Sequence, residues 1–138
     1  MTWQIYALLS AFFAGLTAIL AKIGVAEVPS NVATFIRTIV IVAMTGSIVA
    51  FTGGYKVFPA ISGRTWAFLA LSGVATGFSW LFYFAALKNG PVSRVAPIDK
   101  LSFVIAMTLG VLVLRETAKP TTVAGAAIIV IGVLITLK

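Results

Sequence analysis

This chain contains five long apolar runs, which are separated by short segments that contain polar residues, glycine or proline. A helix of about 20 apolar residues crosses a bilayer, whereas membrane β-strands need only about 9–11. The run lengths therefore predict an all-α, polytopic membrane protein with about five transmembrane helices in a single domain, residues 1–138. The expected spans are residues 3–25, 32–51, 66–87, 95–114 and 119–137, and residues 52–65 are expected to form a loop.

The composition supports a membrane protein. Hydrophobic residues make up 61% of the chain and charged residues only 9%, against about 25% charged residues in soluble domains. Ten Lys and Arg outnumber three Asp and Glu, for a net charge of +7. Because the bases are spread thinly between the apolar runs, we interpret them as anchors facing anionic lipid headgroups. They form no continuous patch of the kind that binds nucleic acid.

The sequence offers little for enzymatic chemistry. Cys and His are absent, which excludes disulfides, thiol nucleophiles, a histidine base and the usual zinc ligands. Asp99 and Glu116 are separated by about one span. We therefore expect no catalytic residues, no metal site and no cofactor.

Ionisable residues stand at the head of the fourth run, where Asp99 and Lys100 follow Pro97. Proline removes a backbone hydrogen bond, and broken helix at membrane depth is tolerated only beside protein or a watery cavity. Charge there is a functional-site hypothesis by default. Asp99 and Ser102 share one helical face. One interpretation places Asp99, Lys100 and Ser102 on a substrate or proton pathway; the other makes Asp99 and Lys100 a charge-balancing pair.

Arg37 lies one or two turns inside the second run. It either extends to the nearby membrane surface or faces the bundle interior, near a substrate anion or an acid. In the third run we interpret Ser79, Trp80 and Tyr83 as the wall of a cavity. The hydroxyls of Ser72 and Thr76 are instead expected to bond back to their own helix.

Two pairs of glycines indicate close helix packing. Gly73 and Gly77 form a GxxxG pair in the third run, and Gly125 and Gly132 share one face of the last. Small residues let helix backbones approach in a membrane. The second pair is suited to a partner helix in a dimer.

The distribution of bases predicts dual topology. An odd number of spans puts the termini on opposite sides, and orientation follows the excess of Lys and Arg in cytoplasmic loops. That excess is nearly nil here, since one side receives Lys56, Arg64, Arg115 and Lys119 and the other Lys22, Lys88, Arg94 and Lys138. We expect the chain to insert both ways and form an antiparallel homodimer, an inverted repeat made from one sequence. A parallel dimer, or pairing with a different chain, is the alternative.

Several segments resemble a known family in their order and spacing. They are 84–91, which contains Ala86-Leu87-Lys88, then 93–101 with Pro97, Leu114-Arg115-Glu116, 125–133, and the early Arg37 of the second run. Over nearly all its length the chain resembles the EamA domain of the drug/metabolite transporter superfamily.

The resemblance implies a multi-pass permease of the bacterial inner membrane, often an exporter of amino acids, metabolites or drugs. Most members carry two such domains, so one domain implies half of an inverted-repeat transporter. The Gly125 and Gly132 spacing is also similar to the dimer-forming last helix of small multidrug resistance transporters. Those carry a glutamate in the first helix, which this chain lacks, so proton-coupled cation export by that mechanism is not expected.

The sequence therefore predicts a secondary transporter that works by alternating access in the bilayer on small metabolites, amino acids or drugs. The expected pathway residues are Asp99, Lys100, Arg37, Trp80, Tyr83, Ser79 and Ser102. The alternative is a non-transporting assembly or lipid-handling subunit, which predicts a well-packed bundle without a polar cavity.

Overall fold

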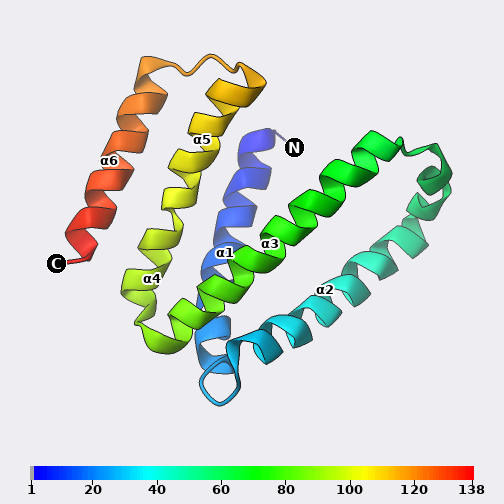
Figure 1. The fold of residues 1–138 in the computed structure, drawn as a ribbon, viewed down its shortest axis with the longest axis horizontal. Coiled ribbons are helices and arrows are strands. Elements are labelled where there is room, and N and C mark those ends of the chain that lie inside the picture. Colours follow the sequence, from blue (N-terminus) through cyan, green and yellow to red (C-terminus); the bar gives the residue numbers. More distant parts are fainter. Residues whose placement is uncertain (1) are drawn as a thin grey trace. The chain divides into compact units, whose positions relative to one another are not determined.

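The computed structural model describes residues 2–138, and every regular element in that range is a helix (Figure 1). The elements are α1 (Trp3–Gly24), α2 (Ser30–Thr52), the 3₁₀-helix η1 (Gly54–Ala60), α3 (Gly63–Asn89), α4 (Val92–Asp99), α5 (Leu101–Leu114) and α6 (Pro120–Thr136). The all-α prediction is confirmed.

The chain forms two compact units, residues 1–88 and residues 89–138. The first unit holds α1, α2, η1 and nearly all of α3, and the second holds α4, α5 and α6. Each unit is described by itself below.

The helices have the length and composition of membrane spans. α1, α2, α3 and the stretch Val92–Leu114 are each long and apolar enough to cross a bilayer, whereas α6 is a shorter apolar helix of 17 residues. Large apolar side chains cover their outer surfaces, and Phe51 is 91% exposed. Such a surface suits contact with lipid, because a helix satisfies its own backbone hydrogen bonds there. The polytopic membrane architecture expected from the sequence therefore holds.

In the first unit, two lysines tie helix ends together. The ammonium group of Lys22, near the end of α1, donates a hydrogen bond to the carbonyl of Leu87 in α3. Lys88 donates a hydrogen bond of 2.8 Å to the carbonyl of Val28, in the turn before α2. The side chain of Leu87 is fully buried. The end of α1, the start of α2 and the end of α3 are thus held at one end of this unit.

The connection after α2 is more regular than the sequence suggested. Gly53 ends α2 with φ of +73°, a left-handed conformation that favours glycine. Instead of the expected loop, η1 follows, a short 3₁₀-helix of the kind common in connectors. The ring of Phe58 in η1 packs edge-on against Trp66 in α3, with centroids 6.2 Å apart. This aromatic contact gives the connection a fixed shape that single-residue turn preferences do not encode.

In the second unit, the expected span 95–114 begins earlier, at Val92, and is interrupted. α4 ends at Asp99 and α5 begins at Leu101. The amide of Lys100 donates to the carbonyl of Pro97 at 3.0 Å, so the chain makes a tighter turn here than an α-helix does. Pro97 contributes to the break because it has no N–H for the preceding turn.

The end of α5 depends on one close approach. Arg115 adopts φ of +56° and ends the helix, and the amide of Glu116 then donates to the carbonyl of Gly110 at 3.1 Å. A Cβ at Gly110 would lie 3.0 Å from a carboxylate oxygen of Glu116. Glycine therefore gives the Glu116 side chain room to fold back over α5. α6 starts at Pro120 and packs against both α4 and α5.

Candidate functional site

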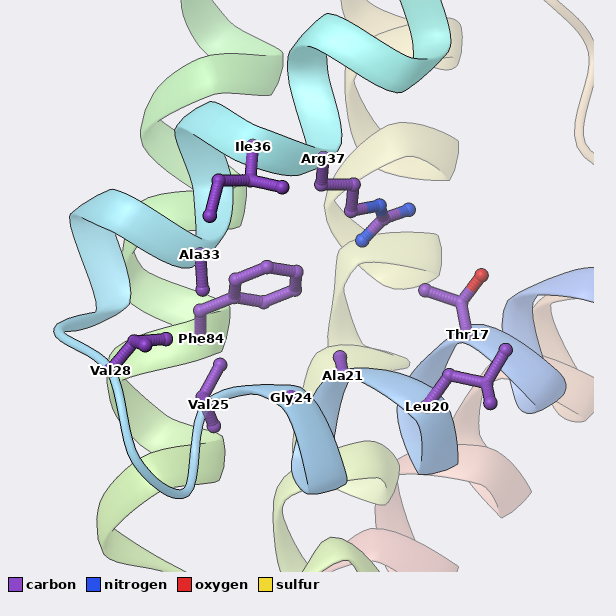
Figure 2. A pocket seen from close by; sticks show the side chains of 10 residues that line it. All are labelled: Thr17, Leu20, Ala21, Gly24, Val25, Val28, Ala33, Ile36, Arg37 and Phe84. Carbon is purple, nitrogen blue, oxygen red and sulfur yellow. The ribbon is translucent and has the colours of Figure 1, made fainter.

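The first unit contains a cavity of about 410 Å³, within the range of about 300–1,000 Å³ typical of small-molecule sites. It lies between the end of α1, the turn that follows, the start of α2 and one residue of α3 (Figure 2). Its lining residues are Thr17, Leu20, Ala21, Gly24, Val25, Val28, Ala33, Ile36, Arg37 and Phe84.

Small residues create this space. Ala21 and Gly24 line it from α1, and Ala33 lines it from α2. A Cβ added at Gly24 would meet no neighbouring atom within 4 Å. Because the connection between α1 and α2 is short, these small side chains stay at the same end of the unit, where larger ones would fill the gap. The cavity is thus a direct consequence of the sequence around the first turn.

Arg37 is the charged residue of the cavity lining. Its guanidinium carbon lies 4.2 Å from the centroid of the Trp80 ring and 5.4 Å from that of Phe84. A cation over an aromatic face gains about 0.5–2 kcal/mol, most when desolvated. These two rings of α3 therefore fix where the guanidinium sits.

The direction of the Arg37 side chain bears on the two interpretations drawn from the sequence. Trp80 lies nine residues before the end of α3 at Asn89, or about 13 Å from that end at a rise of about 1.5 Å per residue. Phe84 lies five residues before it, or about 7 Å. The guanidinium is closer to Trp80, the deeper ring. This geometry favours a side chain facing the interior over one that extends to the nearer surface.

Within the described residues of the first unit, the guanidinium has no carboxylate partner. Glu27 is the acid of that unit, and it is exposed in the turn between α1 and α2 and forms no ion pair with Arg37. Arg37 also makes no hydrogen bond to another described residue. An unpaired charge within a span is expensive. Water or an anionic ligand beside the guanidinium would offset this cost.

Thr17 supplies a second polar group to the same cavity (Figure 2). Elsewhere in the described chain, threonines beyond the first turn of a helix donate back to a carbonyl three or four residues earlier. They are Thr34, Thr38, Thr45, Thr52, Thr76, Thr108 and Thr136. Thr17 makes no such bond within residues 2–138. Its hydroxyl is available to a ligand.

The other residues of α3 expected at a cavity wall lie differently. Trp80 is half-buried beneath the guanidinium of Arg37, and Tyr83 is also half-buried. Ser79 is exposed, and neither Ser79 nor Tyr83 lines this cavity. Thr76 donates to the carbonyl of Ser72 at 2.9 Å, as the sequence predicts, whereas the hydroxyl of Ser72 makes no such bond among residues 2–138.

The expected pathway residues of the fourth run belong to the second unit. Asp99 and Lys100 form an ion pair of 3.5 Å at the break between α4 and α5, with side chains 37% and 59% exposed. Ser102 is exposed in the first turn of α5. An exposed pair of this kind contributes about 0–1 kcal/mol. The pair therefore does little to lock this unit, and its carboxylate is accessible.

The predicted packing glycines have open surroundings. Apart from the adjacent backbone of its own helix, a Cβ added at Gly73, Gly77, Gly125 or Gly132 would meet no described atom of its own unit within 4 Å. Neither unit uses these small faces for its own packing. Their assignment to a dimer contact stays a prediction.

Sequence reasoning did not select Thr17 or the small residues beside it. Thr17, Ala21 and Gly24 follow each other at spacings of four and three, which places them on one helical face. Ala33 follows a tight turn that contains Pro29. This small face beside a turn, opposite an arginine in the next span, is the signal that points to the cavity.

Comparison with known proteins places these features in a family. The model of the EamA-like transporter family matches residues 1–138. A protein of Sinorhizobium sp., named "Uncharacterized transporter in cobO 3'region", is 54% identical over 134 residues, which is 97% of this chain and 95% of that protein. The relative is therefore of the same single-domain size. No solved structure matches the chain.

The cavity predicts a clear pattern of chemical labelling. The chain has no cysteine, so a single introduced thiol reports one position. We expect Thr17→Cys to react with a water-soluble methanethiosulfonate at least roughly tenfold faster than Thr34→Cys, since thiol reactivity follows access. Thr34 is the matched control, because it is buried and its hydroxyl bonds to the carbonyl of Ser30. Equal protection of both thiols would mean that water does not reach the cavity.

Proposed function

This chain belongs to the EamA-like transporter family, and on that premise we propose that it is a secondary transporter of small metabolites, amino acids or drugs in the bacterial inner membrane. One observation carries the proposal: a cavity of solute size within apolar spans holds an arginine that has no acidic partner within the described part of the first unit. A membrane protein that had only to pack would gain nothing from such a group.

The proposed working form is an antiparallel homodimer that alternates access between the two sides of the membrane. The nearly equal numbers of bases on the two sides and the match over 95% of a relative of similar length support pairing. Two copies related by a two-fold axis in the membrane plane would form an inverted repeat. The open glycine faces of α3 and α6 are the surfaces that we assign to this contact.

We assign the pathway to two groups of side chains. In the first unit, Arg37 provides positive charge to the solute, while Ser79, Trp80 and Tyr83 supply its polar and aromatic wall. In the second unit, the group is Asp99, Lys100 and Ser102. The break between α4 and α5 supports this assignment, because interrupted helices line the binding sites of many secondary transporters. Asp99 is the candidate for proton coupling.

The alternative is a non-transporting assembly or lipid-handling subunit. It calls for a bundle packed without a polar cavity, whereas the first unit leaves about 410 Å³ open beside a guanidinium. We also propose no enzymatic role, because the matching family is one of transporters and the relative is named a transporter.

Flux measurements test transport directly. Purified protein in lipid vesicles is expected to move at least one solute from a panel of metabolites, amino acids and drugs faster than protein-free vesicles do. If Asp99 couples protons, Asp99→Asn removes the response to an imposed proton gradient, because the amide does not accept the proton. Absence of flux for every solute, with and without the gradient, would favour the non-transporting alternative.

Reporter fusions test the antiparallel dimer. One fusion carries a C-terminal fluorescent protein, which is active only in the cytoplasm, and the other a C-terminal alkaline phosphatase, which is active only outside it. We expect both fusions to give a signal. The reason is that the bases provide almost no orienting excess. The control is a variant with two lysines added after Lys138, which should bias the C-terminus toward the cytoplasm. A C-terminus found on one side in every molecule would exclude dual insertion.

A further inference from the structure

We propose that the cavity of the first unit binds an organic monoanion, a solute with one acid group on an apolar body and no positive charge. The inference rests on the proposed transport function, since it names the class of solute that this cavity would receive. It follows from the placement of Arg37, from the free hydroxyl of Thr17 and from the apolar remainder of the lining.

Two side chains of the cavity can donate hydrogen bonds to the acid group of the solute. The guanidinium presents N–H groups in a planar fork that binds a carboxylate through two parallel hydrogen bonds. Trp80 and Phe84 hold this fork in place from α3, so little freedom is lost on binding. The hydroxyl of Thr17, on α1, provides a further donor in the same cavity.

The other side chains that line the cavity are apolar and can pack against the apolar body of the solute. Leu20, Val25, Val28, Ile36 and Phe84 line the cavity together with small residues. Burial of apolar solute surface against such side chains contributes about 25 cal/mol per Å² before the costs of association. A mostly apolar site with few polar groups binds amphipathic solutes and orients them by the polar end.

A second, positive charge on the solute would find no counterpart within the first unit. Glu27 is the acid of the first unit, and it is exposed in the turn between α1 and α2 and does not line the cavity. An ammonium group taken from water into this lining would lose its hydration without gaining a carboxylate. The part of the site that the first unit forms therefore discriminates against zwitterions and cations.

The volume argues for a solute rather than a membrane lipid. A cavity of about 410 Å³ suits one small molecule, whereas a phospholipid brings two acyl chains to the same headgroup. We therefore assign the acid group to a free organic acid.

Equilibrium binding to the purified, full-length protein in phosphatidylcholine nanodiscs tests the assignment. The probes are radiolabelled 3-phenylpropionate, phenylalanine and 2-phenylethylamine, which share a phenylethyl group and differ in charge. We expect 3-phenylpropionate to bind at least about tenfold more tightly than either of the others, because only it needs no partner for an ammonium. Equal or tighter binding of phenylalanine or 2-phenylethylamine would overturn the proposal.

Variants locate the binding site. Arg37→Gln should weaken 3-phenylpropionate binding by about tenfold or more, and Thr17→Val by about threefold to tenfold. Arg64→Gln is the matched control, since its guanidinium also lies over an aromatic ring, Phe68 at 5.8 Å, but is exposed outside the cavity. Thr76→Val is the control for Thr17. Both controls should bind as wild type does, and unchanged affinity in Arg37→Gln would also overturn the proposal.

Two further measurements distinguish the possible outcomes. Protein in nanodiscs that contain phosphatidylglycerol should bind 3-phenylpropionate equally well. Saturable competition by this lipid that depends on Arg37 would show that the cavity binds lipid and would contradict the assignment of a free organic acid. If vesicle flux occurs for other solutes while 3-phenylpropionate does not bind, the monoanion is wrong and transport stands. If 3-phenylpropionate binds and no solute crosses the vesicle membrane, transport is wrong and the binding site stands.

Discussion

The cavity of the first unit is arranged around the contact between the guanidinium of Arg37 and the face of the Trp80 ring. A charge carried inside a span needs water, an anion or an acidic side chain beside it. Among the described residues of the first unit no acid pairs with Arg37, and its guanidinium lies closer to Trp80 than to Phe84, the ring nearer the end of α3. The cavity is therefore a requirement of this arginine as much as a gap in packing. Small residues on α1 and α2 keep that space open.

The parts that hold the cavity lie at one end of the unit. Lys22 and Lys88 hydrogen-bond to carbonyls of α3 and of the first turn, which keeps the ends of three helices together. The second unit has its own irregularity, where Pro97 and the turn at Lys100 interrupt the span beside Asp99. In both units, charge occurs where the regular helix or its packing is interrupted. That coincidence supports the interpretation of these positions as functional, because hydrocarbon makes both features costly.

The helices were predictable because one physical requirement, backbone hydrogen bonding in an apolar solvent, acts on every long apolar run. Pro97 also marked the disturbed region of the fourth run correctly. The turn at Lys100, the 3₁₀-helix η1 and the direction of Arg37 were not predictable in detail, since each depends on a partner distant in the sequence or on competing turn geometries. Thr17 was missed for a related reason: its free hydroxyl becomes apparent only when the other helical threonines are seen bonding to their own carbonyls.

The central claim is that Arg37 serves a ligand and that the fold does not need it. Thermal unfolding of Arg37→Leu in lipid bicelles, compared with wild type, tests this most directly. Leucine removes the cost of holding a charge within a span and forfeits a cation–π contact of about 0.5–2 kcal/mol. Because these two effects oppose each other, we expect the variant to be about as stable as wild type, or more stable. A variant less stable than wild type by about 2 kcal/mol or more, the loss expected of a core truncation, would show that Arg37 holds the helices together and would contradict the account.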